Sequence, residues 1–243
     1  MVVTISLILR GWLLLPVAAS GATIPAPLAC LARHYGVTAL PDALQLPDGT
    51  KLPLHDGKQK TADERLEHPD VADAFLQRYQ PGPIAPVTVA DWDPGRVRLD
   101  PLLRAVYPKR GIVRIDFLGK KASVHERAAP AFARVAARLQ KAQAADPKLE
   151  PFLTKLGGTL NERNIAGTDR PSAHSWGIAI DINPSLSNYW RWEKNGWRNQ
   201  IPQAIVDAFE AEGFIWGGRW SHFDTMHFEY RPELLDPTCF DGP

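Results

Sequence analysis

The sequence predicts an α+β protein in which a small antiparallel sheet is flanked by helices and preceded by a proline-rich extension. Twelve of the 22 prolines fall between Pro25 and Pro108, so this part of the chain is rich in turns. After Gly111, strand-like and helix-like segments follow one another, with turn residues between neighbouring strands. With 243 residues, 44% of them hydrophobic, the chain can form one sizeable core or one core with a smaller appendage.

Hydrophobic periodicity and turn residues predict the individual elements of this fold. In chain order they are a hairpin over residues 44–54, short helical pieces over 61–79, a strand over 111–119, a second strand ending at His125, a helix over 128–146, a strand over 172–183, a helix over 201–213 and a strand over 224–230. We expect residues 23–110 to form an accessory subdomain and residues 111–243 to carry the chemistry.

The first 22 residues have the composition of a secretory signal peptide. They are almost entirely apolar and end in the small residues 18–22, a pattern typical of a cleavage site. We therefore expect an exported protein, located in the periplasm, in the cell wall or outside the cell. An uncleaved membrane anchor is the alternative, but the apolar run after Arg10 is too short to cross a bilayer.

The chain has two cysteines, Cys30 near the predicted mature start and Cys239 near the end. In an exported protein this pair suggests one disulfide that ties the two ends together. Two unpaired thiols are the alternative that the sequence leaves open.

Two predicted strands bring polar side chains into an apolar setting. Successive side chains of a strand point to opposite faces of the sheet. Asp181 therefore points to the face away from the isoleucines of residues 178–182, and His227 points to the face away from Phe228. If the two strands are neighbours, Asp181 and His227 converge above small residues, and His174 joins them from the approach to the first strand. A buried carboxylate needs a partner of this kind, because an uncompensated charge in a core is too costly.

Two imidazoles and one carboxylate, with a fourth position open, form the ligand set of a catalytic zinc site. Calcium is less suitable because it prefers a cage of oxygen atoms. Each residue alone also has an ordinary interpretation as a hydrogen-bonding side chain, and Asp181 could instead pair with Arg163 or Arg170.

Asp224, three residues before His227, favours the catalytic interpretation. Zinc-assisted hydrolysis needs a nearby base that takes a proton from the attacking water and gives it to the leaving amine. Arg163 is then the natural group to stabilise an oxyanion or to bind a substrate carboxylate. The alternatives are a turn or cap role for Asp224 and a surface position for Arg163.

Two stretches resemble the motifs of a known family. SAHSWGIAID (172–181) resembles S-x-H-x-x-G-x-A-x-D, and DTMHFE (224–229) resembles D-x-x-H-F-E, both from the zinc D-alanyl-D-alanine carboxypeptidase and L-alanyl-D-glutamate endopeptidase family. These enzymes, which include the vancomycin-resistance D,D-peptidases, cut peptidoglycan stem peptides. The resemblance runs from about Gly158 to Tyr230, and residues 23–110 have no counterpart in it.

The resemblance implies a small α+β domain with a central antiparallel sheet that binds one zinc ion. It implies His174, Asp181 and His227 as zinc ligands and Asp224 as the general base. Arg163 matches an upstream arginine of the family, and Ser172 matches the motif serine, a hydrogen-bonding partner for the substrate. Aspartate instead of glutamate at the base position points towards the endopeptidase-like branch.

Other candidates lie in the aromatic segments 188–200 and 213–220. Trp216 could form part of a substrate cleft and Glu193 could bind a substrate amine, although burial of the tryptophans in the core is an equally good interpretation. His222 is the alternative zinc ligand, in second place because it lies in the loop before the strand.

The resulting hypothesis is an exported zinc peptidase acting on peptidoglycan stem peptides, as a D-alanyl-D-alanine carboxypeptidase or an L-alanyl-D-glutamate endopeptidase. The alternative from a different class is a non-catalytic, zinc-stabilised cell-wall-binding module, which should lack either the base or Arg163. The formal net charge of +1 gives no basic footprint of a nucleic-acid binder.

Overall fold

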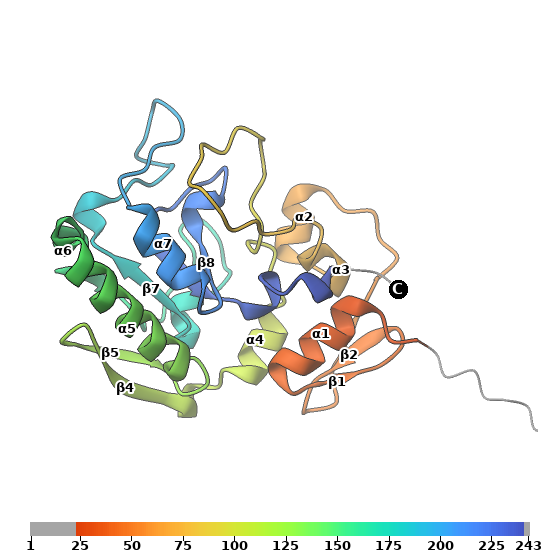
Figure 1. Cartoon of the computed structure of the whole chain (residues 1–243). Helices are drawn as coiled ribbons and strands as arrows, with labels where there is room; N and C mark the ends of the chain where they lie inside the picture. Colours follow the sequence, from red (N-terminus) through yellow and green to blue (C-terminus); the bar gives the residue numbers. More distant parts are fainter. Residues whose placement is uncertain (1–22, 241–243) are drawn as a thin grey trace, which may run out of the picture.

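The computed structural model describes residues 23–240 of the chain, and Figure 1 shows how its elements are arranged. The predicted signal peptide lies outside the described residues. The helices are α1 (Ala26–Tyr35), α2 (Ala62–Glu67), α3 (Val71–Ala74), α4 (Asp100–Val106), α5 (Ala129–Ala145), α6 (Glu150–Leu153) and α7 (Gln203–Glu210). The strands are β1 (Thr38–Ala39), β2 (Ala43–Gln45), β3 (Lys51–Pro53), β4 (Ile112–Phe117), β5 (Lys120–His125), β6 (Leu156–Gly158), β7 (Ala179–Ile182), β8 (Phe214–Trp216) and β9 (His227–Tyr230).

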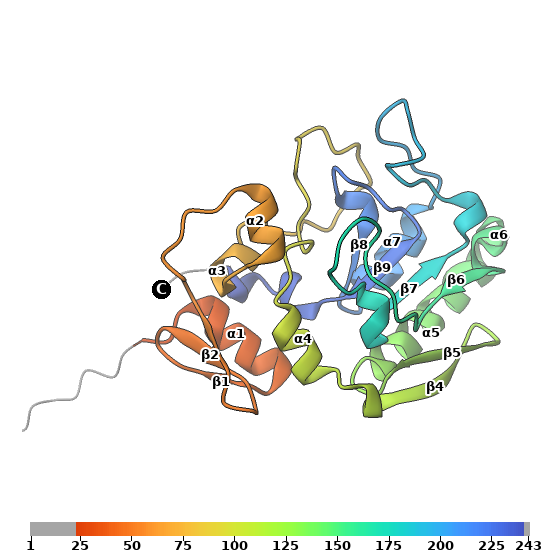
Figure 2. The ribbon, with the colours of Figure 1, turned by 180° about the vertical axis from the view of Figure 1, so that it is seen from behind.

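The strands form small antiparallel sheets, so the chain combines helices and antiparallel strands as the sequence predicts. One sheet has the order β1-β2-β3, a second is the β4-β5 hairpin, and the largest has the order β6-β7-β9-β8. Helix α5 packs against β4 and α7, and α7 packs against β8. Figure 2 shows α1–α3 with β1 and β2 at one end of the molecule, and β4–β7 with α5 and α6 at the other.

The pairing of β7 with β9 positions the polar residues identified in the sequence. The two strands are antiparallel neighbours, with Asp181 opposite His227 and Ile180 opposite Phe228. The Phe228 ring stacks on Phe209 of α7 with 3.9 Å between the ring centroids. One face of the sheet is therefore buried under α7, while Asp181 and His227 share the opposite face, which confirms the predicted convergence of these two strands.

The strand predicted over residues 172–183 is shorter in the structure. Residues 173–176 form a 3₁₀ turn, and Gly177 follows in the left-handed conformation with φ of 66°. A Cβ atom at Gly177 would lie 2.8 Å from the backbone nitrogen of His125. Glycine is therefore required both for the backbone conformation and for the close approach of β5.

Gly177→Ala is expected to lower the free energy of unfolding by about 2–4 kcal/mol, because strain from a positive φ adds to a clash with backbone. Urea denaturation measures the change. Gly119→Ala is the matched control, since Gly119 has φ of 77° and a Cβ atom there would meet no atom of residues 23–240 within 4 Å. Equal losses in the two variants would contradict a role for the close approach.

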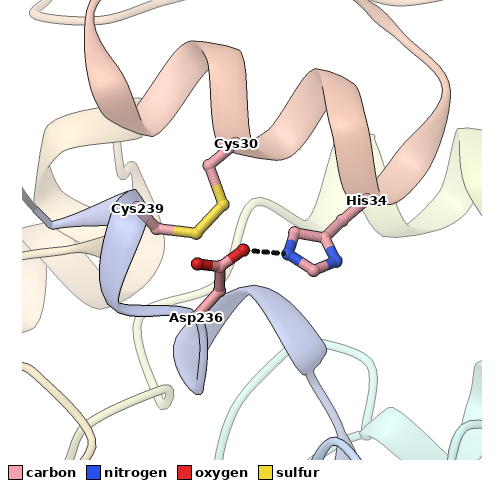
Figure 3. Close-up of side chains that lie close together, drawn as sticks. All are labelled: Cys30, His34, Asp236 and Cys239. Atoms are coloured by element: carbon pink, nitrogen blue, oxygen red, sulfur yellow. Dashed lines mark hydrogen bonds and ion pairs between the residues drawn. A yellow bond between two sulfur atoms is a disulfide. The ribbon is translucent and has the colours of Figure 1, made fainter.

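The two ends of the described chain are joined by a disulfide. Cys30 of α1 is bonded to Cys239, 209 residues away, which confirms the predicted pairing. Beside it, the His34 imidazole lies 3.0 Å from the Asp236 carboxylate (Figure 3). A disulfide that closes so long a loop is expected to stabilise the fold mainly by restricting the conformations of the unfolded chain.

The hydrophobic core does not stop at the predicted boundary near residue 110. Leu28, Leu31 and Leu103 belong to the same cluster of buried side chains as Phe132 and Phe228. The accessory subdomain therefore packs directly onto the segment with the motifs, and a functional boundary at residue 110 stays a prediction. Within residues 23–240, no helix is both long enough and apolar enough to span a bilayer.

Candidate metal centre

Three side chains predicted as ligands point at one another on the face of the largest sheet that lies opposite α7. His174 comes from the 3₁₀ turn, Asp181 from β7 and His227 from β9. His174 Nε2 lies 3.1 Å from Asp181 Oδ1, and His227 Nδ1 lies 3.0 Å from the same oxygen. The two imidazole nitrogens are 3.2 Å apart. The structure thus brings all three residues together.

This donor set fits a single divalent cation. In a tetrahedral zinc site with ligands at about 2.0–2.2 Å, neighbouring donor atoms are about 3.3–3.5 Å apart. The three separations found here are 3.0–3.2 Å, which differ from that spacing by a few tenths of an ångström. Imidazole nitrogen and carboxylate oxygen are also donor types that suit zinc. His174, Asp181 and His227 are therefore the residues that would hold the ion.

The ring nitrogens that face away from the centre also have partners. His174 Nδ1 donates a hydrogen bond to the Thr159 carbonyl at 2.6 Å, and His227 Nε2 lies 3.5 Å from Glu229 Oε2. Such contacts fix the ring orientation and keep the metal-facing nitrogen unprotonated, as is usual around metal-binding histidines.

Electrostatics at the centre also favours a cation. Burial alone would raise the pKa of Asp181, but hydrogen bonds from His174 and His227 hold it well below its usual range. Burial alone would lower the pKa of His227, but contacts with Asp181 and Glu229 raise it to about 10. The carboxylates that favour an imidazolium would equally attract a metal ion.

Asp224 lies in the loop before β9, beside the three ligands. Its Oδ1 atom is buried and has no hydrogen-bond partner among the residues that the structure describes. Burial raises the pKa of Asp224 to about 6. An unpartnered buried carboxylate oxygen is costly in a purely structural role, so this atom points to a ligand or substrate beside it.

The centre opens into a cavity of about 310 Å³. Asp181, Asp224 and His227 contribute to its lining, together with Arg163 and Ser172. Arg163 is exposed, and its guanidinium forms no ion pair within residues 23–240. Aromatic side chains supply further walls: Tyr189, Trp190, Trp192 and Trp220.

Two residues predicted to bind substrate lie outside this cavity. Trp216 is fully buried in β8, and its indole N–H donates to the Thr225 carbonyl at 2.9 Å. Glu193 accepts a hydrogen bond from the Asn188 side chain at 2.6 Å. Trp216 is therefore part of the core, and Glu193 forms a contact within its own loop. These positions do not fit the substrate-binding roles predicted for the two residues.

His222, the alternative ligand, is also held elsewhere. Its Nδ1 atom lies 2.6 Å from Asp93 Oδ2, and its backbone N–H donates to Asp93 Oδ1 at 3.0 Å. His222 is absent from the group of three converging donors. It lines the same cavity, next to Trp190.

A second group of ligand-type side chains lies between α1 and the C-terminal turn: Cys30, His34, Asp236 and Cys239 (Figure 3). The disulfide occupies both sulfur atoms, so neither is a free thiolate, the form that binds metals. Asp236 is bound by His34 and, at 2.7 Å, by Arg33. The group is therefore explained as a disulfide with an adjacent ion pair.

Sequence reasoning missed two groups that contact the histidines of the metal centre. It assigned Glu229 no function, although alternation along the strand put it on the same face as His227. Thr159 gave no signal because only its backbone carbonyl takes part.

The fold and the site together define a candidate metal-dependent hydrolase centre, carried on a small antiparallel sheet. Residues 166–230 match the family described as D-alanyl-D-alanine carboxypeptidase. The match confirms the resemblance inferred from the motifs and contains His174, Asp181, Asp224 and His227. It does not reach Arg163 or the N-terminal part. No solved structure matches the chain.

Glu229→Gln is expected to weaken zinc binding about 10–100-fold, because it removes the carboxylate that orients His227. Competition with a fluorescent zinc chelator measures this affinity. Glu233→Gln is the control, because Glu233 shares the partner Arg231 at 2.6 Å but is not a contact of His227. Equal affinities in the two variants would rule out the orienting role of Glu229.

Proposed function

We propose that this protein is a zinc-dependent peptidase that hydrolyses amide bonds in peptidoglycan stem peptides. The observation that carries the proposal is the convergence of three donors next to Asp224, which lines the same cavity as Asp181 and His227 and whose buried Oδ1 has no hydrogen-bond partner among the described residues. The match of residues 166–230 to a peptidase family supports the same conclusion. The non-catalytic binding module is less favoured, because such a module has no need for Asp224 in this position.

When bound, zinc would act as a Lewis acid that polarises a substrate carbonyl and lowers the pKa of the attacking water. Asp224 Oδ1, which has no hydrogen-bond partner among residues 23–240, takes the proton of the attacking water and later gives it to the nitrogen of the leaving amine. Thr159 and Glu229 hold the two imidazoles in place during the reaction.

Arg163 and Ser172 line the cavity and are proposed to bind the substrate. The Arg163 guanidinium forms no ion pair within the part of the chain that the structure describes, so its N–H groups can donate to a developing oxyanion or to a terminal carboxylate. Donation to an oxyanion suits cleavage of the D-alanyl-D-alanine bond and of the L-alanyl-D-glutamate bond alike. Binding of a terminal carboxylate suits a D-alanyl-D-alanine carboxypeptidase. Aspartate at position 224 favours the L-alanyl-D-glutamate endopeptidase type.

Export to the periplasm, the cell wall or the cell exterior forms part of the proposal. The disulfide between Cys30 and Cys239 supports it, because such bonds persist in oxidising compartments. A substrate in the cell wall requires the same location.

Digestion of purified peptidoglycan by the zinc-loaded protein, followed by mass spectrometry of the released fragments, tests the activity. Release of single terminal alanines would establish a carboxypeptidase, and stems with a new N-terminal D-glutamate would establish an endopeptidase. Zinc bound to the protein with no released fragment would reject the proposed peptidase.

A further inference from the structure

The cavity of the metal centre continues into a larger one. The adjoining cavity has a volume of about 570 Å³, compared with about 310 Å³ for the cavity at the centre. Six residues line both: Leu66, Glu67, Arg96, Thr168, Trp190 and His222. The two cavities therefore form one groove that extends beyond the metal centre.

The N-terminal part of the chain supplies most of the walls of the adjoining cavity. The adjoining cavity is lined by residues of α2, by residues of α3 and those just after it, and by residues 91–97. The segment 166–230 contributes Trp190 and its neighbour Arg191, with Thr168 and His222. This part of the chain had no counterpart in the motifs. Its position gives it a role in forming the groove.

Several contacts hold residues 91–97 against the loop that precedes β9. The Trp92 carbonyl accepts a hydrogen bond from the Ser221 backbone at 2.8 Å, and the Pro94 carbonyl accepts one from the Trp220 indole at 2.7 Å. Asp93 binds His222 at 2.6 Å. The groove is thus formed in advance, which lowers the entropy cost of binding a chain in it.

The lining has the chemistry of a peptide-binding surface. Leu76 is 59% exposed and lines the adjoining cavity, while Trp192 is 66% exposed and lines the cavity of the metal centre. Charged groups of both signs stand around the adjoining cavity, among them Arg65, Arg191 and Asp63. Exposed apolar side chains together with charges of both signs suit a peptide that carries both amino and carboxyl groups, as peptidoglycan stems do.

We propose that the adjoining cavity is a second substrate subsite, which binds the neighbouring peptide of a cross-linked peptidoglycan stem. The inference rests on the proposed function and names its preferred substrate: a cross-linked stem, which is long enough to occupy both cavities, and not a free stem peptide.

The test compares hydrolysis of a free stem pentapeptide with hydrolysis of a cross-linked muropeptide dimer. In Leu76→Asp, kcat/KM for the dimer is expected to fall about tenfold through loss of an apolar contact and an added charge, with kcat/KM for the free peptide unchanged. Val89→Asp is the matched control, since Val89 is 60% exposed and lines neither cavity. Leu76→Trp, which narrows the cavity without a charge, should reproduce the selective loss.

A selective loss on the dimer in both Leu76 variants, absent from Val89→Asp, supports the subsite. Equal changes for the two substrates, or no change for the dimer, would overturn it while leaving the proposed peptidase intact. Failure of the unaltered protein to hydrolyse either substrate would instead reject the proposed function, and the subsite with it.

Discussion

The Asp224→Ala variant is expected to keep its zinc, while its rate of hydrolysis falls about 10²–10⁴-fold, the usual contribution of a positioned acid–base group. Asp224 is not one of the three converging donors, so its removal leaves the ligand set complete. Its buried Oδ1 has no other partner in residues 23–240, so the side chain has little structural role to lose. Initial rates on peptidoglycan and the zinc content of the same sample measure the two effects.

His227→Ala provides the contrast to this variant. It removes one of the three donors, so zinc and hydrolysis should be lost together. Asp224→Asn, which keeps the shape of the side chain but not its basicity, should behave like Asp224→Ala. Retained hydrolysis in either Asp224 variant would reject the general base, and loss of zinc from them would move Asp224 into the ligand set.

Arg231→Leu is expected to lower the free energy of unfolding by about 3–5 kcal/mol, the cost of leaving buried carboxylates without their cation. Arg231 is 4% exposed and binds Glu233 at 2.6 Å and Glu229 at 3.1 Å. It also donates to the Gly95 carbonyl at 3.1 Å, and this hydrogen bond connects residues 91–97, which line the groove, to the end of β9.

Arg134→Leu is the control for Arg231→Leu, and urea denaturation measures both. Arg134 pairs with Glu212 at the surface, where its side chain is 56% exposed, so its loss should cost less than about 1 kcal/mol. Similar losses in the two variants would contradict the importance of the buried ion network.

The metal centre could be predicted because it depends on local patterns. Alternation along a strand places Asp181 and His227 on defined faces, and the apolar neighbours Ile180 and Phe228 identify the buried face. His174 was assigned correctly to the same group although it lies in a 3₁₀ turn instead of a strand. A glycine in an apolar run does not reveal the left-handed conformation that Gly177 adopts.

Other features depend on contacts that leave no local pattern. All three residues of β8 are buried, so the strand shows no alternation from which the position of Trp216 could be read. The groove walls depend on long-range hydrogen bonds such as that between Trp92 and Ser221, 129 residues apart. In a proline-rich segment with little periodicity, such contacts cannot be inferred from the sequence.

The central claim is that the centre formed by His174, Asp181 and His227 binds zinc and performs hydrolysis. The most direct test measures zinc content and peptidoglycan hydrolysis on one sample, before chelation, after it and after zinc is returned. The account predicts one zinc ion per chain, loss of hydrolysis in proportion to the zinc removed, and recovery on its return. Undiminished hydrolysis by the metal-free protein would contradict the account.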